Sequence, residues 1–320
     1  MQQKASIGSC MNIPTKETLL AKLAQVQYWG EALRWRKFWR QPFTYLSSIF
    51  YHKCIYPFRH KGILRKAKLF WGEEMWVQLP AGMEILFTGG KAHDAETRLA
   101  RFFIHQLQAG DCVIDIGAHY GYFSLLAAYL VGKNGKVLSF EAGKSTLEIL
   151  QRNVAAHPQI KTFHQAIAAA QGEATFYEFS PLYSEYNTLE IEQFAEKRWF
   201  KNNPPEKFSV ATRSLDDVIA TEKIVPRLIK IDVEGAEAQI VAGSTQLLRS
   251  QNPFIVMEYL CAARDNLQHQ KAAQLLKNEG FMPYAITQEG SLQALTDINA
   301  YLQDKQLETD NIVFCKEKNE

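Results

Sequence analysis

The sequence predicts an α/β fold, in which a mostly parallel sheet carries helices on both of its faces. Two observations along the 320 residues support this fold class. Short apolar runs alternate with segments of helical periodicity from about residue 112 onward, and such alternation is typical of parallel sheets. A glycine-rich segment also joins the first of these runs to the next helix, which is where α/β sheets place their ligands.

A change of composition near residue 75 divides the chain in two. Residues 31–68 hold ten Lys or Arg against one acid, Glu31, whereas the rest of the chain holds 26 against 33. Five of the six tryptophans also precede residue 77. We therefore expect a basic, aromatic-rich, mainly helical extension over residues 1–75 and an α/β domain over residues 76–320.

The composition is that of a soluble globular protein, with 47% hydrophobic and 22% charged residues. No apolar run approaches the roughly 18 residues that a membrane-spanning helix needs. The N-terminus also lacks the pattern of a secretory signal. The five cysteines are scattered without a Cys-x-x-Cys pair, which argues against a zinc site and against a disulfide framework. We expect a cytoplasmic protein with no bound metal.

The expected elements follow one another in a regular order. The first is a helix, because Leu19, Leu23 and Val26 have helical spacing. Further helices are predicted over residues 95–107, 120–131, 147–154 and 237–248, and in a segment that ends at Gly280. Strands are predicted over residues 75–79, 82–88, 112–116, 136–140, 160–164, 227–233, 253–259, 281–286 and 311–315.

Residues 113–124 carry the strongest signal for a binding site. They read Val-Ile-Asp-Ile-Gly-Ala-His-Tyr-Gly-Tyr-Phe-Ser, and Gly117 and Gly121 allow a sharp turn and the close approach of a ligand. This Gly-x-x-x-Gly spacing differs from the Gly-x-Gly-x-x-Gly of dinucleotide folds, whose helix N-terminus cradles a pyrophosphate. Asp115 would repel a pyrophosphate but suits a cationic ligand without phosphate, such as S-adenosylmethionine. The alternative is a strand-to-helix turn that binds nothing.

Further positions suit a nucleoside. Glu141 ends the second predicted strand of the alternating region, 20 residues after Gly121, where a carboxylate can accept both ribose hydroxyls. NAD enzymes place an acid in the same way, so Glu141 alone does not separate the two cofactors. Gln165 and Ala166 follow the third strand, where the adenine edge should lie. A solvated acid and an ordinary turn are the structural alternatives for these positions.

Residues 230–237, Lys-Ile-Asp-Val-Glu-Gly-Ala-Glu, place acids at the mouth of the same crevice. Methyl transfer from a sulfonium needs positioning, and a base as well when the acceptor is a hydroxyl. Asp232, Glu234 and His119 are the candidate bases. The carboxylates could instead hold a hard cation that lowers the pKa of the acceptor. Glu237 could simply complement a helix dipole.

Together these segments resemble the FkbM-type methyltransferase family. The resemblance covers roughly residues 76–316 and rests on residues 115–124, 140–141, 213–218, 230–237 and 310–314. It implies a Rossmann-like class I methyltransferase fold, with a seven-stranded sheet whose last strand is antiparallel. It also implies S-adenosylmethionine as the methyl donor and an oxygen acceptor on a sugar or secondary metabolite. Family members commonly have Glu-Pro after the second strand, where this chain has Glu141 followed by Ala142 and Gly143.

The motifs and the resemblance nominate two sets of site residues. The candidate catalytic residues are Asp232, Glu234 and His119. The candidate cofactor-binding residues are Asp115, Gly117, Ala118, His119, Tyr120, Gly121, Glu141, Ala142, Gln165, Ala166 and Asp232.

A connection over roughly residues 180–207 is too long for a simple turn. Its aromatic and acidic side chains are Tyr183, Tyr186, Phe194, Trp199, Phe200, Glu185, Glu190, Glu192 and Glu196. We expect either a substrate wall, with rings that stack on a sugar or polyketide face, or a short helix packed on the core. If it is a wall, exchanging it with that of a relative should change acceptor preference and leave cofactor affinity unchanged.

Residues 28–76 combine positive charge with aromatic side chains. They could lie on an anionic membrane surface, with tryptophans at the interface. They could instead pack on the catalytic domain or on a second subunit of a homo-oligomer, and we favour packing. Nucleic acid is not expected as a partner, because no recognition motif accompanies the charge.

The leading interpretation is an S-adenosylmethionine-dependent O-methyltransferase, with a small-molecule or carbohydrate acceptor such as a sugar, a glycolipid or a secondary metabolite. An NAD-dependent oxidoreductase is the enzyme alternative, and the Gly-x-x-x-Gly spacing disfavours it. A degenerate methyltransferase domain that docks partners through its basic arm is the non-enzyme alternative. The intact acids and glycines speak against degeneration. Nitrogen stays open as the acceptor atom.

Overall fold

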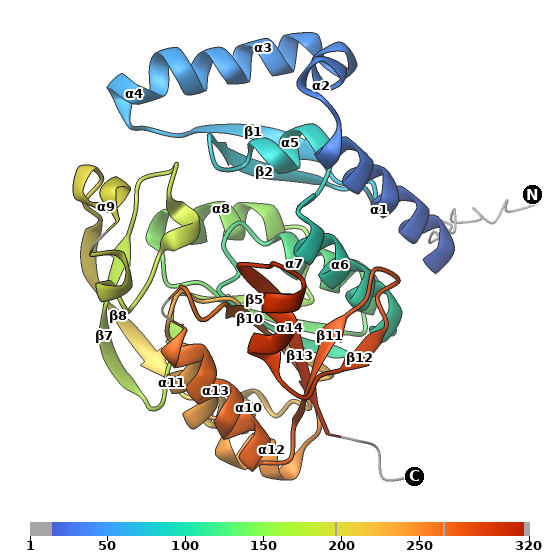
Figure 1. Cartoon of the computed structure of the whole chain (residues 1–320), viewed down its shortest axis with the longest axis vertical. Coiled ribbons are helices and arrows are strands. Elements are labelled where there is room, and N and C mark those ends of the chain that lie inside the picture. Colours follow the sequence, from blue (N-terminus) through green and yellow to red (C-terminus); the bar gives the residue numbers. More distant parts are fainter. Residues whose placement is uncertain (1–14, 196, 265, 317–320) are drawn as a thin grey trace, which may run out of the picture.

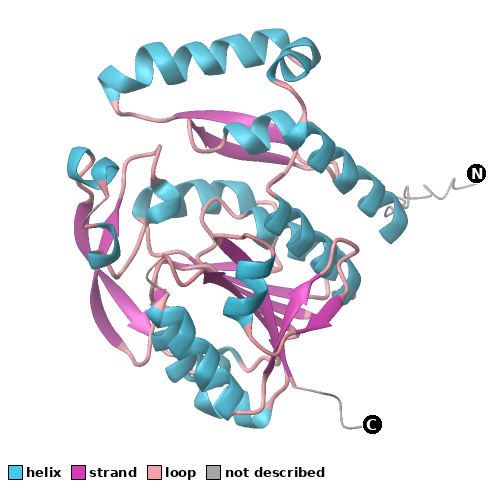
Figure 2. Cartoon of the chain, viewed as in Figure 1, coloured by secondary structure: helices cyan, strands magenta, loops and turns pink. Residues whose placement is uncertain are grey.

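An eight-stranded sheet forms the centre of the computed structural model, which describes residues 15–195, 197–264 and 266–316 (Figure 1; Figure 2). The strands, in spatial order, are β12 (Leu292–Ala294), β11 (Met282–Ile286), β13 (Thr309–Cys315), β10 (Phe254–Leu260), β9 (Leu228–Ile231), β3 (Cys112–Ile116), β4 (Lys136–Phe140) and β5 (Ile160–Phe163). Neighbours from β10 to β5 are parallel, whereas β13 is antiparallel to both β10 and β11. The α/β class and the antiparallel last strand are therefore confirmed, and the short β12 adds an eighth strand to the seven expected.

Two layers of helices cover this sheet. Alternate strand residues point to opposite faces, so that Val113 joins one hydrophobic core and Ile114 the other. The first core packs against α6 (Asp94–Gln106), α7 (Tyr122–Val131) and α8 (Lys144–Val154). The second packs against α10 (Leu215–Glu222), α11 (Glu237–Ala242), α12 (Thr245–Ser250), α13 (Leu267–Asn278) and α14 (Ile298–Asp304). The parallel strands are covered on both faces, which explains their continuous apolar sequences.

Two predicted elements were wrong. Residues 82–88 do not form a strand, because Met83–Thr88 forms helix α5, which ends at Gly89 in the left-handed conformation. The helix predicted over residues 237–248 is broken into α11 and α12 at Gly243. A Cβ on Gly243 would lie 2.4 Å from the carbonyl oxygen of Ala168, so the break between the two helices lies at a glycine that packs closely against a neighbouring loop.

A smaller sheet lies beside the carboxyl end of β5. It has the order β6 (Ala166–Ile167), β8 (Glu206–Arg213), β7 (Gly172–Glu178), and the sequence had not predicted β7 or β8. The chain between β7 and β8 forms η2 (Ser184–Tyr186), η3 (Glu192–Phe194) and α9 (Arg198–Asn202). The long connection expected in this region is therefore built from short helical turns.

The N-terminal region is helical at first and then forms a hairpin. Its elements are α1 (Lys16–Glu31), α2 (Arg34–Arg40), α3 (Pro42–Phe50), η1 (Tyr51–Ile55), α4 (Tyr56–Arg59), β1 (Ile63–Lys68) and β2 (Glu74–Leu79). Strand β1 pairs antiparallel with β2, which crosses residue 75, and α2 to α4 lie above this hairpin (Figure 1). Within the described part of the chain, no helix is long and apolar enough to cross a membrane.

Candidate functional site

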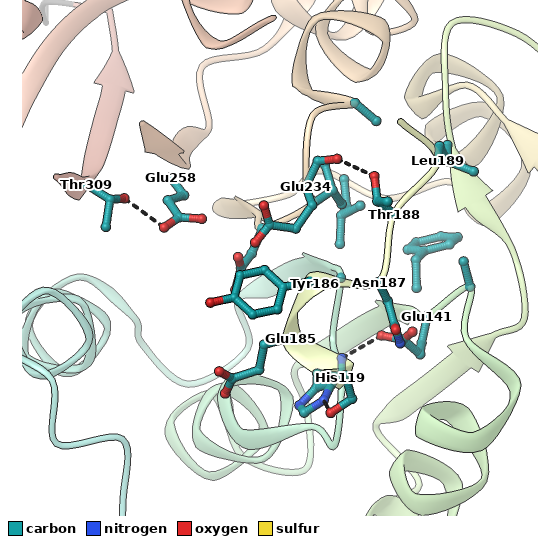
Figure 3. A pocket seen from close by; sticks show the side chains of 18 of the residues that line it. His119, Glu141, Glu185, Tyr186, Asn187, Thr188, Leu189, Glu234, Glu258 and Thr309 are labelled. Atoms are coloured by element: carbon teal, nitrogen blue, oxygen red, sulfur yellow. Dashed lines mark hydrogen bonds between the residues drawn. The ribbon is translucent and has the colours of Figure 1, made fainter. Parts of the chain in front are cut away.

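One cavity of about 510 Å³ opens at the carboxyl ends of β3, β4, β9 and β10 (Figure 3). Residues 184–189 form one of its walls, and the start of α6 forms another. Ligands of doubly wound sheets bind at this edge, because the loops that follow parallel strands meet there. The cavity therefore lies where the glycine loop was expected to place a ligand.

Gly117 and Gly121 shape the floor of the cavity in different ways. Gly117 has φ +76°, and a Cβ there would lie 1.9 Å from the carbonyl oxygen of Asp232. It therefore lets the loops after β3 and β9 touch. Gly121 has φ +90° and precedes α7, and a Cβ there would lie 2.5 Å from Leu150 on α8. Of the two glycines, only Gly117 lines the cavity, while Gly121 starts the helix behind it.

Glu141 lies at the end of β4 and is held by three donors. Its Oε2 accepts from the backbone N–H of His119 at 2.7 Å, as drawn in Figure 3. Its Oε1 accepts from the backbone N–H of Gly143 and from the hydroxyl of Thr146, both at 2.8 Å. Burial raises the pKa of Glu141, and these hydrogen bonds act in the opposite direction. Because a carboxylate oxygen can accept more than one hydrogen bond, the fixed side chain can still accept from ribose hydroxyls.

The part of the cavity beside Glu141 has the character of an adenosine site. Its apolar surface comes from Phe140, Ala142 and Ala166. Gln165 Oε1 and Asn187 Nδ2 are buried there without a hydrogen-bond partner among the described residues. A buried acceptor and a buried donor without partners are costly unless a ligand satisfies them, and adenine offers both an amino donor and ring acceptors. These residues therefore fit a nucleoside cofactor.

Lys230 separates two aspartates below the cavity. Asp115 is buried, accepts from the hydroxyl of Ser124 at 2.6 Å and lies 3.5 Å from Lys230 Nζ. Asp232 lines the cavity and accepts from Lys230 Nζ at 2.8 Å. Burial alone would raise the pKa of Asp232, but Lys230 and Lys91 outweigh it and hold this pKa well below its usual range. Asp232 thus presents a permanent negative charge to the cavity.

The opposite part of the cavity is rich in acids. Glu234 follows β9, Glu258 belongs to β10, and both carboxylates extend toward the same space in Figure 3. Burial raises the pKa of Glu258 to about 7, with help from Asp232. Burial also raises the pKa of Glu234 well above its usual value, and Glu258 adds to the effect. Glu258 accepts a hydrogen bond of 2.7 Å from the hydroxyl of Thr309.

Lys91 is the counter-charge on the other side of this acidic part. It lies 3.5 Å from Glu96, and both residues line the cavity. Burial opposes the charge of Lys91, but Glu96, Asp232 and Glu185 outweigh burial and raise its pKa. Burial raises the pKa of Glu185. The cavity therefore holds more acids than bases, and several of its carboxyls are readily protonated.

His119 joins the two parts of the cavity. Its ring stacks on Tyr120 with centroids 3.7 Å apart, and its Nε2 lies 3.0 Å from the hydroxyl of Ser184. Burial lowers the pKa of His119 to about 3, and the charge of Lys91 acts in the same direction. The imidazole is therefore neutral at neutral pH and binds through its ring nitrogens rather than through charge.

The connection between β7 and β8 contributes both a wall and a packed aromatic cluster. Residues 184–189 line the cavity, among them Tyr186. Trp199 of α9 lies outside the lining and stacks on Tyr183, with centroids 4.8 Å apart and planes inclined by 14°. Trp199 also contacts Tyr186 and Phe194. Most aromatic rings of this connection therefore pack on one another and support the wall from behind.

The structure brings most of the predicted site residues together. The lining includes Gly117, His119, Glu141, Ala142, Gln165, Ala166, Asp232 and Glu234. The other candidates lie in or next to the same loop without lining the cavity: Asp115, Ala118, Tyr120 and Gly121. Among the described residues, no group of three or more His, Cys, Asp or Glu side chains is arranged to hold a metal ion.

Sequence reasoning missed Glu258, Lys91 and Asn187, all of which line the cavity, and named Glu185 only as part of the long connection. Glu258 had a usable signal, because it is an acid near the end of the otherwise apolar run 253–259, as Glu141 is at the end of β4. Lys91 and Asn187 had none, since each reaches the cavity from a loop whose path depends on distant contacts.

Comparison with known proteins places these features in a family. A curated relative, the hexuronic acid methyltransferase AglP of Haloferax volcanii, is 22% identical over 165 residues. That match covers 51% of this chain and 62% of the relative, so the chain spans less than two thirds of the relative's length.

Solved structures show lower similarity. The FkbM methyltransferase of Methylobacillus flagellatus is 14% identical, with a TM-score of 0.39 over 64% of this chain and 43% of that one. An S-adenosylmethionine-dependent O-methyltransferase of Thermotoga maritima is 11% identical, with a TM-score of 0.37 over 80% of this chain and 79% of that one.

The family model of the FkbM methyltransferase domain matches residues 115–283, just over half of the chain. The match includes the glycine loop, Glu141 and Asp232, which shape the cavity described above. S-adenosylmethionine is accordingly the cofactor. The chain belongs to the FkbM methyltransferase family.

Proposed function

We propose that the protein is an O-methyltransferase that transfers a methyl group to a hydroxyl of a sugar. The observation that carries this proposal is the composition of one cavity. One part presents Glu141 together with the unpartnered Gln165 Oε1, and the other presents Glu234 and Glu258. A nucleoside cofactor and a hydroxyl acceptor can therefore meet within a single enclosed space.

The cofactor part of the cavity is assigned as follows. Glu141 would accept from the ribose hydroxyls, and Gln165 and Asn187 would pair with the adenine edge. S-adenosylmethionine supplies an electrophilic methyl group on a positively charged sulfur. Asp232, which Lys230 and Lys91 keep ionised, would contribute the matching negative charge at the centre of the cavity.

A carboxylate would take the proton of the acceptor hydroxyl as the hydroxyl oxygen bonds to the methyl carbon and the bond from that carbon to sulfur breaks, which leaves the neutral thioether S-adenosylhomocysteine. Of the predicted bases, Asp232 is too acidic for this role, because Lys230 and Lys91 hold its pKa well below its usual range. His119 is too weakly basic, because burial lowers its pKa to about 3. Glu258 and Glu234 suit it better, because burial raises the pKa of both and brings that of Glu258 to about 7. We assign the proton transfer to Glu258, with Glu234 beside it.

A sugar acceptor suits the rest of the cavity. Carboxyl groups such as Glu185 and Glu234 can bind several hydroxyls at once, and the ring of Tyr186 offers an apolar face. The relative in Haloferax volcanii is named for a hexuronic acid, which supports a carbohydrate. Because acids outnumber Lys91 and Arg264 in the lining, we expect a neutral or amino sugar to be a better acceptor than a uronic acid.

The first test is calorimetric titration with S-adenosylmethionine, S-adenosylhomocysteine and NADH. Binding of the first two, weakened about tenfold or more in Glu141→Gln, is expected, because one charge-assisted contact is lost. Glu178→Gln is the matched control, since Glu178 is also buried and holds the start of α8 without lining the cavity. Binding of NADH alone, or of none of the three, would contradict the proposal.

The second test is transfer of a labelled methyl group to a panel of sugar glycosides that are neutral, amino-substituted or uronic. Product carrying an O-methyl ether is expected, with the uronic glycoside the slowest. Transfer to nitrogen only, or to no member of the panel despite cofactor binding, would contradict the choice of acceptor and leave the cofactor assignment standing.

A further inference from the structure

The segment from the end of α1 through α2, α3, η1 and α4, whose exposed side we call the outer face, carries an unusual set of apolar side chains. Its helices α2, α3 and α4 lie above the β1–β2 hairpin (Figure 1). Of the twelve large hydrophobic residues that are exposed in the described part of the chain, eight fall between residues 28 and 58. They are Tyr28, Leu33, Trp35, Trp39, Phe43, Leu46, Phe50 and Phe58. Soluble proteins rarely gather so many in one place unless something covers them.

Helical spacing places three of these side chains on one face of α3. Residues 42–59 run as one helical segment through α3, η1 and α4. Phe43, Leu46 and Phe50 follow one another at helical intervals of three and four residues, and Phe43 is 87% exposed. The opposite side is anchored, since Tyr51 and Tyr56 are buried in the main core. The outer stripe is therefore an unpartnered face of a well-fixed element.

Positive charge surrounds this stripe. Residues 32–72 contain no Asp or Glu but ten Lys or Arg, and Arg36, Arg40, Lys53 and Arg59 are exposed. Among the described side chains of this stretch, only Lys66 forms an ion pair, with Glu74. Arg36 and Arg40 contact Tyr28, Trp35, Trp29 and Phe87, but these are neutral partners, so the arm keeps a net positive charge.

We propose that this face docks on an anionic lipid bilayer. Exposed Trp, Phe and Leu side chains on a helix flanked by Lys and Arg match the headgroup boundary, where rings enter the apolar layer and cations meet lipid phosphates. A second copy of the chain is a poorer occupant, because two such basic faces would repel each other. A nucleic acid would leave Leu33, Leu46 and Phe50 in water.

This face is linked to the wall of the cavity. The hydroxyl of Tyr56, in α4, accepts from the backbone N–H of Leu182 at 3.0 Å and lies 3.2 Å from Ser180 Oγ. Leu182 lies two residues before Ser184, with which the segment that lines the cavity begins. A bilayer bound to α3 and α4 would therefore hold the support of the acceptor wall in place.

Vesicle sedimentation with the full chain tests the proposal. We expect binding to phosphatidylcholine vesicles that contain phosphatidylglycerol, little binding to phosphatidylcholine alone, and release as salt rises. Replacing both Lys53 and Arg59 by Gln should weaken binding roughly tenfold or more, because each cation near an anionic surface contributes about 1 kcal/mol. Tryptophan emission should shift to shorter wavelength on binding, and Trp39→Phe should reduce that shift.

A triple variant tests the apolar stripe. Trp39→Ser, Phe43→Ser and Phe50→Ser together should abolish binding while the melting temperature stays near that of the wild type, since all three are exposed. Val225→Ser and Met282→Ser, which change exposed apolar residues elsewhere, are the matched control and should bind normally. Equal binding by the triple variant, binding to neutral vesicles only, or a dimer that the triple variant dissociates would each overturn the proposal.

Discussion

At the scale of single residues, the place of a carboxyl group in the fold and the groups that surround it have separate effects on what that carboxyl can do. Glu141, Asp232 and Glu258 all lie at or near the carboxyl ends of parallel strands. Two backbone N–H groups and a hydroxyl bind Glu141, whereas Lys230 at 2.8 Å keeps Asp232 ionised. Burial dominates at Glu258 and raises its pKa to about 7. In the proposed reaction, these three similar side chains would serve three tasks: to bind hydroxyls, to supply charge and to accept a proton.

The pH profile should reveal the base. Glu258 acts only when deprotonated, so kcat should rise as pH increases through about 7, the pKa to which burial raises this carboxyl. Glu258→Gln should lower kcat by about 100-fold or more and leave the Kd of S-adenosylhomocysteine unchanged. Thr309→Val removes a hydrogen bond that favours the ionised form, so the profile should move to higher pH. A profile without this rise in the wild type would count against Glu258.

Gly117 should tolerate no side chain. A Cβ there would lie 1.9 Å from the carbonyl oxygen of Asp232, and its φ of +76° is strained for other residues. We expect Gly117→Ala to lower the free energy of unfolding by about 3 kcal/mol or more. Gly132→Ala is the control, because its backbone (φ +66°, ψ −170°) is also strained for other residues but no atom lies within 4 Å of the added Cβ, so its loss should be clearly smaller. Equal losses in urea unfolding would refute the contact argument.

At the scale of elements, the connection between β7 and β8 determines how the acceptor part of the cavity is held. Trp199 stacks on Tyr183 and touches Tyr186, so the wall depends on a cluster that faces away from the cavity. The segment combines a wall of the cavity with short helical turns packed on one another, and its role in the choice of acceptor stays a prediction.

Trp199→Ala should loosen that wall. We expect the KM for the acceptor to rise about tenfold, because Tyr186 loses its support, while the Kd of S-adenosylhomocysteine stays unchanged. Trp199→Phe should restore most of the affinity, since Phe keeps a ring in the cluster. An equal loss of cofactor affinity would show that the wall and the cofactor part are not separate.

At the scale of the whole molecule, the basic extension and the methyltransferase domain share one core. We propose residues 1–75 as an extension and 76–320 as the methyltransferase domain, yet the β1–β2 hairpin crosses the boundary. Leu19, Leu23 and Trp71 belong to the same hydrophobic cluster as Leu99 of α6. The extension is thus structural on its inner side, and its outer side is free to bind a surface.

Removing residues 1–75 should therefore abolish cooperative thermal unfolding, because the apolar face of α6 and α7 would be left in water. The triple serine variant of the outer face is the matched comparison and should keep its melting temperature. A truncated chain that melts cooperatively at the wild-type temperature would show that the domain is independent of the extension.

The α/β class, the glycine loop and the acids at residues 141 and 232 could all be predicted from the sequence. These are local patterns, in which a strand, a turn and the next helix can be read from neighbouring residues. The tertiary structure decided what depends on distant contacts. It alone placed Glu258 beside Glu234 and Asp232, pressed Gly117 against the backbone of Asp232, and left the outer face of residues 33–58 exposed. The charge state, the close packing and the exposure of a residue each depend on neighbours from other strands and helices. These neighbours are distant in the sequence, so a short stretch of sequence does not reveal them.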